Sequence, residues 1–541
     1  MATAADQDVE TTAQLVVGVL RAGVEAQWLG KLSAYLGASE QALRLIISIF
    51  LGYPFALFYR QFLFYKDCYL IHLFHIVTGL SIAYFNFGNQ LYHSLTCVVL
   101  QFLILRLMGR TITAVLTTFF LQMVYLLAGY YYTATDNYDI KWTMPHCVLT
   151  LKLIGLAVDY YDGGRDWNSL SVEQQKYAIL RVPSLLEIAG FSYFYGGFLV
   201  GPQFSMNNYM KLVQGQMTNV PGKKPNSILP ALKRLSLGLF YLVGYTLLSP
   251  YITEDYLLTQ EYENSPFWFR CLYMLVWGKF VLYKYVTCWL VTEGVCILTG
   301  LGFNGWDEKG HPLWDACANM KVWLFETTPR FTGTIASFNI NTNAWVARYF
   351  FKRLKFLGNK VVSQGLSLLF LALWHGLHSG YLICFQMEFL IVIVERQVGH
   401  IHYTGKVSSS EGQVLTLHSC LSLPGCHLNY REPSLEQAGI HHCPQAHLLP
   451  SAADHSLAFH GLFYDCLLPF YLGQMVQSLQ VYLLSWPCFL PEPPIHIALC
   501  SQNNGAKKRK IKESRVICLP DGLKWDWYRN YCLPFHRTPL P

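Results

Sequence analysis

Long apolar runs separated by short polar stretches are the feature that most constrains how this chain can fold. A transmembrane helix needs about 20 predominantly apolar residues, because the hydrocarbon core of a bilayer is about 30 Å thick. Runs of suitable length lie at residues 41–63, 69–86, 91–109, 111–132, 146–161, 179–200, 234–252, 267–300 and 364–396. The last two are long enough for a kinked helix or a pair, so the pattern predicts about nine to eleven spans.

The spans are expected to be helices, because lipid cannot satisfy free backbone groups and the runs are too long and unpatterned for barrel strands. Composition agrees, since 53% of residues are apolar and 13% are charged, against about 25% charged in soluble domains. We therefore predict an all-α fold, a polytopic integral membrane bundle of helices around a buried reaction chamber. The net charge of +7 comes from basic residues that gather in loops, as in cytosolic loops, and indicates no nucleic-acid partner.

A histidine in the last long run is the first candidate for chemistry. His375 stands in Leu373-Trp374-His375-Gly376, and a polar ring at membrane depth usually lines a cavity or a reaction path. A second motif, Ser337-Phe338-Asn339-Ile340-Asn341-Thr342-Asn343-Ala344-Trp345, places Asn339 36 residues upstream of His375.

These two motifs resemble the membrane-bound O-acyltransferase family, in which an asparagine preceded by an aromatic residue pairs with a histidine in a Trp-His-Gly-like setting. Segments 196–210, 279–305 and 314–357 are similar to its lysophospholipid branch, and the likeness covers roughly residues 36–397. The resemblance implies a membrane-bound O-acyltransferase domain at 41–397. It also implies acyl transfer from acyl-CoA to the sn-2 hydroxyl of a lysophospholipid, such as lysophosphatidylcholine, in the endoplasmic reticulum membrane, as a step of phospholipid remodelling.

The residue types suit that reaction. A neutral His375 could act as general base on the acceptor hydroxyl, an effect worth about 10²–10⁴-fold. Asn339 could donate a hydrogen bond to the developing oxyanion, or could instead orient the hydroxyl or the thioester. Acyl-CoA is then a co-substrate, no further cofactor is expected, and the partners are acyl-CoA, the lysophospholipid and membrane lipids. A homo-oligomer is left open.

Two alternatives concern His375 itself. It could be a structural histidine that donates to a helix carbonyl, an interpretation that the family resemblance makes less favourable. It could also form a metal pair with His378 one turn on, but no third ligand of matching spacing is visible, so no metal site is predicted.

A basic group follows the asparagine motif. If residues 344–358 form one helix, Arg348, Lys352 and Lys355 make one stripe with Arg353 beside it. Such a stripe could hold the phosphates of CoA. The alternative is an ordinary cluster at the membrane edge that sets topology.

The two ends differ from the rest of the chain. Residues 1–40 are predicted to hold an amphipathic helix at the membrane interface. Residues 398–541 hold 8 of the 16 cysteines, 11 of the 18 histidines and 13 of the 24 prolines, and the resemblance stops there. We expect this tail to be disordered, or an out-of-frame or alternatively spliced translation. Such a tail makes a catalytically impaired isoform one alternative to an active enzyme. The other is a membrane transporter or channel in which His375 and Asn339 line a substrate path.

Overall fold

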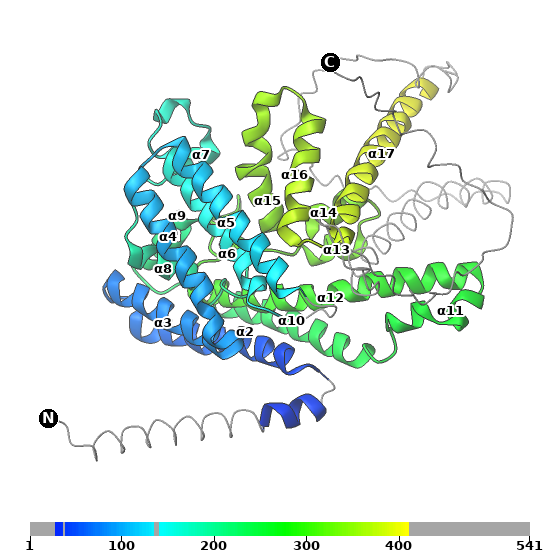
Figure 1. Ribbon diagram of the computed structural model, residues 1–541, viewed down its shortest axis with the longest axis horizontal. Coiled ribbons are helices and arrows are strands. Elements are labelled where there is room, and N and C mark those ends of the chain that lie inside the picture. Colours follow the sequence, from blue (N-terminus) through cyan, green and yellow to red (C-terminus); the bar gives the residue numbers. More distant parts are fainter. Residues whose placement is uncertain (1–27, 36–37, 135–139, 411–541) are drawn as a thin grey trace, which may run out of the picture. The chain divides into compact units, whose positions relative to one another are not determined.

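The computed structural model describes residues 28–35, 38–134 and 140–410, with side chains to residue 397, and every regular element among them is helical. The elements are α2 (Glu40–Phe58), η1 (Tyr59–Leu63), α3 (Cys68–Phe87), η2 (Gly88–Leu91), α4 (Tyr92–Met108), α5 (Ile112–Thr133), α6 (Thr143–Asp162), η3 (Trp167–Ser169), α7 (Val172–Tyr177), α8 (Leu185–Ser192), α9 (Met206–Val213), α10 (Ile228–Leu248), η4 (Asp255–Leu258), α11 (Gln260–Asn264), α12 (Phe267–Thr299), α13 (Val322–Thr327), α14 (Phe331–Ser337), α15 (Ile340–Tyr349), η5 (Phe351–Leu357), α16 (Lys360–His375) and α17 (Ser379–Ser410). Figure 1 shows their arrangement. The predicted all-α fold is confirmed. The tail beyond residue 410 and most of the predicted interfacial segment lie outside the described residues.

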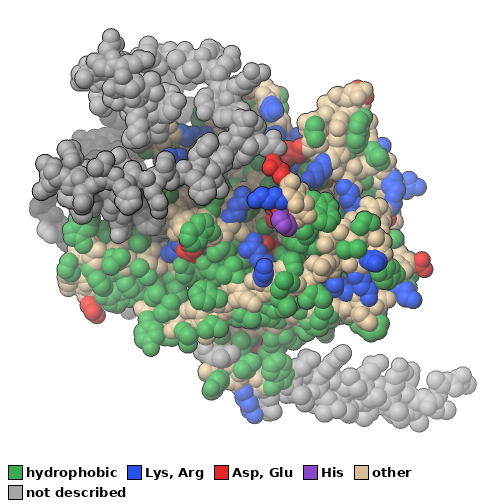
Figure 2. All heavy atoms as spheres, turned by 180° about the vertical axis from the view of Figure 1, so that it is seen from behind, with side chains coloured by type: hydrophobic (Ala, Val, Ile, Leu, Met, Phe, Trp, Pro, Cys, Tyr) green, Lys and Arg blue, Asp and Glu red, His purple; other side chains and the backbone are tan. Residues whose placement is uncertain are grey.

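Five stretches among the described residues are long and apolar enough to cross a membrane. They are Glu40–Leu63, Cys68–Met108, Ile112–Thr133, Ile228–Leu248 and Phe267–Thr299. Several apolar side chains on these helices are exposed, among them Phe120 of α5 and Phe240 of α10 at 60% and 72%. A large exposed apolar surface of this kind indicates contact with lipid. On the face shown in Figure 2, hydrophobic side chains cover much of the lower part, whereas Lys and Arg side chains lie mainly above and beside them.

Helix α12 is one continuous helix of 33 residues, so the run at 267–300 does not divide into a pair. It packs against α10 and against α2. A Cβ on Gly52 would lie 2.8 Å from the Val295 side chain, so the glycine lets α2 approach α12 closely. The run at 364–396 does divide into a pair, α16 and α17, separated at residues 376–378.

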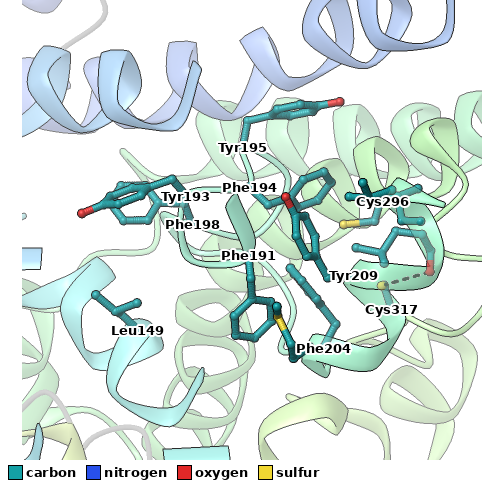
Figure 3. Packing of buried hydrophobic residues seen from close by; sticks show 14 of the residues in the cluster. Leu149, Phe191, Tyr193, Phe194, Tyr195, Phe198, Phe204, Tyr209, Cys296 and Cys317 are labelled. Carbon is teal, nitrogen blue, oxygen red and sulfur yellow. Dashed lines mark hydrogen bonds between the residues drawn. The ribbon is translucent and has the colours of Figure 1, made fainter. Parts of the chain in front are cut away.

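The expected span at 179–200 is wrong. Helix α8 begins with a capping box in which Ser184 and Glu187 satisfy each other's backbone amides, but it ends after only eight residues. The chain then runs without regular structure through a buried aromatic cluster that includes Phe194 and Tyr195 (Figure 3). Irregular backbone at membrane depth is tolerated where protein surrounds it. Hydropathy could not distinguish this buried segment from a lipid-facing helix.

Candidate active site

The two predicted catalytic residues lie at the ends of a helical hairpin formed by α15 and α16 (Figure 1). The condition for a single basic stripe, one helix over 344–358, is not met, because the backbone breaks at Phe350, with φ −123° and ψ −68°. Gly358 then adopts a left-handed conformation, and the Asn359 side chain accepts hydrogen bonds from two amides of the first turn of α16. These residues reverse the chain between the two helices.

Aromatic stacking joins the two helices of the hairpin. The Trp345 ring lies 6.0 Å from that of Phe370, with 19° between their planes, and the Phe350 ring lies 4.6 Å from Phe370 at 16°. Further along, the Ser363 hydroxyl donates to the Leu354 carbonyl at 3.3 Å. Residue numbers rise on one helix as they fall on the other, so the helices are antiparallel.

The hairpin brings Asn339 and His375 to the same level. Asn339 precedes Trp345 by six residues, and His375 follows Phe370 by five. At about 1.5 Å of rise per residue, they lie about 9 Å and about 7.5 Å from the stacked rings, in the same direction along the hairpin. The 36 residues that separate Asn339 from His375 in the sequence are thus the residues that run along α15 and return along α16.

His375 is the last residue of α16 and is half-buried. Its ring lies 5.6 Å from that of Tyr381 and 5.2 Å from that of Phe385, both on α17. The preceding Trp374 fixes the end of the helix, because its indole N–H donates to the Cys147 carbonyl at 2.8 Å. Among the described residues, the structure gives the imidazole no hydrogen-bond partner. The helix therefore ends on a histidine whose ring nitrogens bond to no described residue.

Asn339 precedes the first residue of α15 and has φ 50° and ψ 44°, the only positive φ of a non-glycine residue that the structure describes. Asparagine tolerates this left-handed conformation better than most residues. Asparagine at such a position commonly caps the helix through its side chain, but Asn339 makes no side-chain capping bond. Its side-chain oxygen accepts a hydrogen bond from the Asn319 side chain at 3.3 Å, and its side-chain nitrogen donates to no described residue.

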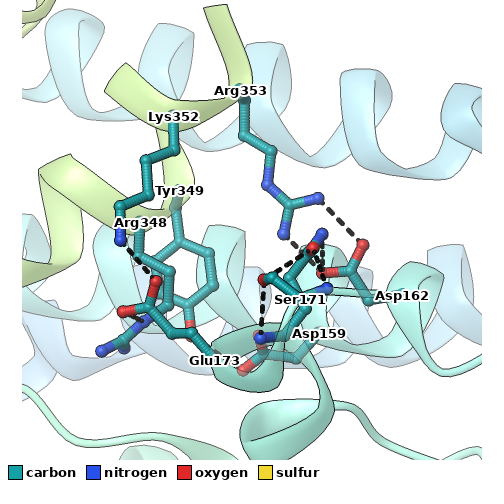
Figure 4. A network of polar contacts seen from close by, with 9 residues as sticks. Asp159, Asp162, Ser171, Glu173, Arg348, Tyr349, Lys352 and Arg353 are labelled. Carbon is teal, nitrogen blue, oxygen red and sulfur yellow. Dashed lines mark hydrogen bonds and ion pairs between the residues drawn. The ribbon is translucent and has the colours of Figure 1, made fainter. Parts of the chain in front are cut away.

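Three members of the basic group, Arg348, Lys352 and Arg353, pair with carboxylates of α6 and α7 (Figure 4). Arg348 and Lys352 both bind Glu173 of α7, at 3.1 Å and 2.6 Å. Arg353 binds Asp162 at the end of α6 through both terminal nitrogens of its guanidinium. Burial alone would raise the pKa of Glu173, but hydrogen bonds from Lys352 and Arg348 outweigh it and leave that pKa below its ordinary value. Three of the four cations are thus ion-paired, to two carboxylates, and Lys355 is exposed.

A cavity of about 70 Å³ lies between α6, α9 and α15, with Lys152, Gln203 and Trp345 among its lining residues. Lys152 is 2% exposed, and its ammonium has one long hydrogen bond, to the Phe191 carbonyl at 3.4 Å, and lies over the Phe204 ring. The Gln203 side-chain oxygen and the Trp345 indole nitrogen are buried without a hydrogen-bond partner. Buried polar groups are usually paired, so two unpaired atoms beside a weakly bonded ammonium make this cavity a candidate binding site.

Sequence reasoning missed Lys152. The available signal was a lysine in the apolar run 146–161, where an ionisable residue is a functional candidate by default. Asp159, on the same helix, also lines the cavity and accepts a hydrogen bond from Tyr349 at 2.9 Å. Within the described part of the chain, no group of three His, Cys, Asp or Glu side chains could hold a metal ion.

Neither His375 nor Asn339 is among the residues that line the cavity between α6, α9 and α15. A helical membrane protein with an imidazole and a carboxamide at one end of a hairpin has the makings of an integral membrane enzyme. Residues 127–403, which include both side chains, match the membrane-bound O-acyltransferase family. The chain is 82% identical over 401 residues to lysophospholipid acyltransferase 5 of Homo sapiens, which covers 74% of this chain and 82% of that protein. The protein of the same name from Drosophila melanogaster is 41% identical over 382 residues, covering 70% and 76%. This chain belongs to the membrane-bound O-acyltransferase family.

The family decides between two of the alternatives that the sequence left open. It confirms the predicted acyltransferase and gives no support to a transporter or channel. The catalytic and phosphate-binding roles of individual residues remain predictions, as do the domain limits.

Proposed function

We propose that this protein transfers a fatty acyl chain from acyl-CoA to the sn-2 hydroxyl of a lysophospholipid, lysophosphatidylcholine and related lipids, in the endoplasmic reticulum membrane. The hairpin that brings Asn339 and His375 to one level is the observation that carries the proposal. The names of the relatives support the lipid acceptor, since those proteins are called lysophospholipid acyltransferases.

In the proposed reaction, a ring nitrogen of His375 accepts the proton of the acceptor hydroxyl while that oxygen attacks the thioester carbonyl carbon. A carbon–oxygen bond forms, and negative charge gathers on the carbonyl oxygen, where Asn339 stabilises it. When the intermediate collapses, the carbon–sulfur bond breaks and the leaving sulfur takes the proton back from the imidazolium. The products are a diacyl phospholipid and free CoA, and His375 returns to its neutral state.

The cavity between α6, α9 and α15 is the proposed site for the pantetheine arm of acyl-CoA. That arm carries amides and a hydroxyl, which would satisfy the unpaired side-chain oxygen of Gln203 and the indole N–H of Trp345 and would offer Lys152 further acceptors. Arg348 lines the same cavity and also belongs to the basic group. With the arm in the cavity, the CoA phosphates would reach Arg348, Lys352, Arg353 and Lys355. They would compete for these cations with the carboxylates of Glu173 and Asp162.

The test uses the full chain purified in detergent and reconstituted in phosphatidylcholine liposomes. Release of free CoA thiol and formation of diacyl product are followed with lysophosphatidylcholine, other lysophospholipids, a sterol and a serine-containing peptide as acceptors. His375→Ala should lower the transfer rate at least about 100-fold. His378→Ala, three residues on and exposed, should change it less than about threefold.

Three results would count against the proposal. Preference for the sterol or the peptide would remove the lysophospholipid acceptor, and a His375→Ala enzyme within about tenfold of the parent would remove the general base. A parent that folds but transfers no acyl group to any acceptor would mark this form of the protein as impaired.

A further inference from the structure

The three asparagines of the sequence Asn339-Ile340-Asn341-Thr342-Asn343 have different tasks. The side-chain nitrogen of Asn341 donates to the backbone carbonyls of Cys317 and Ala318, both at 3.1 Å. That of Asn343 donates to the carbonyls of Ile335 and Phe338, at 2.9 and 3.0 Å. Both groups therefore hold the backbone around the start of α15. Asn339 alone of the three donates no side-chain hydrogen bond to a described residue.

A fourth asparagine, Asn319, contacts this turn at three points. Its backbone carbonyl accepts a hydrogen bond from the backbone N–H of Ile340 at 3.1 Å, and its side-chain oxygen accepts one from the backbone N–H of Asn341 at 2.9 Å. Its side-chain nitrogen donates to the Asn339 side-chain oxygen at 3.3 Å. Asn319 is 2% exposed, so these bonds are shielded from competing water.

The loop that carries Asn319 is itself anchored. Arg234 of α10 donates to the Met320 carbonyl at 3.4 Å and forms an ion pair at 2.9 Å with the buried Glu293 of α12. On the other side, the Lys321 amide donates to the Ser337 carbonyl at 2.9 Å. The loop that carries Asn319 is thus tied to α10 and α12 and to the turn that Asn319 contacts.

These bonds determine which end of the Asn339 carboxamide points outward. A backbone N–H can only donate, so the oxygen of Asn319 must face Asn341. The nitrogen of Asn319 must then face Asn339, and a donor requires the oxygen of Asn339 as its acceptor. The nitrogen of Asn339 is left pointing away, with no acceptor among the described residues.

The geometry points to Asn319 as a positioning residue that presents the N–H groups of Asn339, and not its carbonyl oxygen, to the reacting thioester. The inference rests on the proposed acyl transfer. Asn339 then acts as a donor to the oxyanion, and it does not accept a hydrogen bond from the acceptor hydroxyl. A preorganised donor of this kind needs no rotation of the amide while charge develops.

Asn319→Asp is the sharpest test, because it keeps the shape and the acceptor for the Asn341 amide but replaces the donor with a carboxylate oxygen. That oxygen would repel the Asn339 oxygen and favour the rotated amide. We expect kcat to fall about 100-fold, the effect of losing one oxyanion donor, while KM for acyl-CoA and for the lysophospholipid changes less than about threefold. Asn304→Asp, the same change at an exposed asparagine that donates to Asp315, should leave kcat within about twofold.

The double variant with Asn339→Ala separates positioning from mere support of the fold. If Asn319 acts through Asn339, Asn319→Asp should lower kcat less than about twofold further in the Asn339→Ala background, because the group it orients is gone. Losses that multiply, or an undiminished kcat in the single variant, would overturn the inference.

A parent without acyl transfer would refute the proposed function alone, and a second readout then tests the inference. In protein labelled with ¹⁵N-asparagine, and with signals assigned by single substitutions, the side-chain amide of Asn339 should exchange with solvent faster than those of Asn341 and Asn343. Equal protection of the three would contradict the outward-pointing nitrogen.

Discussion

Replacing Phe370 with alanine should separate the geometry of the hairpin from the stability of the fold. Phe370 is 4% exposed and stacks on both Trp345 and Phe350, so it holds α15 against α16. Lipid solvates an apolar side chain as well as protein does, so the transfer part of the usual Phe→Ala cost is small for a bundle in a membrane. The cavity part remains, and a void of roughly 100 Å³ at about 24 cal/mol per Å³ costs about 2.4 kcal/mol.

The catalytic effect should exceed what this destabilisation causes. Rings that no longer stack let the two helices shift, and a displacement of about 1 Å between reacting groups can cost about 100-fold in rate. We expect kcat for Phe370→Ala to fall about 100-fold at a temperature where the variant remains folded. Thermal unfolding in detergent and initial rates at saturating substrates measure the two quantities separately.

Phe280→Ala is the matched control. Phe280 is also 4% exposed and stacks on Tyr245, with ring centres 4.9 Å apart and 11° between planes, but it lies between α10 and α12. It should lower the midpoint of unfolding by a similar amount and leave kcat within about threefold. Equal losses of rate in both variants, or an unchanged kcat for Phe370→Ala, would refute the argument that the hairpin sets the distance between Asn339 and His375.

Three further variants test neighbouring features. Lys152→Met removes a buried charge with one long hydrogen bond, so the unfolding midpoint should stay or rise while KM for acyl-CoA increases about tenfold; an unchanged KM would make the lysine structural. Glu173→Gln removes the carboxylate that pairs with Lys352 and should lower KM for acyl-CoA about two- to fivefold. The loss of stability should stay under about 1 kcal/mol, because the pair is partly exposed. A raised KM would assign Glu173 a positioning role. Gly376→Ala places a side chain on a backbone with φ 152° and its Cβ 2.9 Å from the Tyr381 ring. It should lower the free energy of unfolding by about 1–3 kcal/mol and shift the end of α16 enough to lower kcat. Unchanged unfolding and unchanged kcat would show that the glycine is dispensable.

Much of the local structure could be predicted from the sequence. Most apolar runs became helices near their expected limits, as at 111–132 and 146–161, which correspond to α5 and α6. The exception is 179–200, where apolar residues are buried in an irregular segment instead. Hydropathy reports that a residue avoids water, but not whether lipid or protein surrounds it.

The candidate site divides in the same way. The motif residues Asn339 and His375 could be selected from the sequence, because their residue types and settings are rare in apolar segments. The carboxylate partners of the basic group could not be predicted, because Arg348 pairs with Glu173, 175 residues away, and Arg353 pairs with Asp162, 191 residues away. Partners so distant in sequence leave no trace in local periodicity.

By itself, the sequence determined an all-α membrane enzyme of the O-acyltransferase family and two of its candidate catalytic side chains. These follow from local properties, namely the length of apolar runs and short motifs. Only the tertiary structure decided that the hairpin brings these side chains to one level, that Lys152 lines a cavity with no described carboxylate as its partner, and that Asn319 orients the amide of Asn339. Such features depend on how distant segments pack, and packing is a property of the whole chain rather than of any window within it.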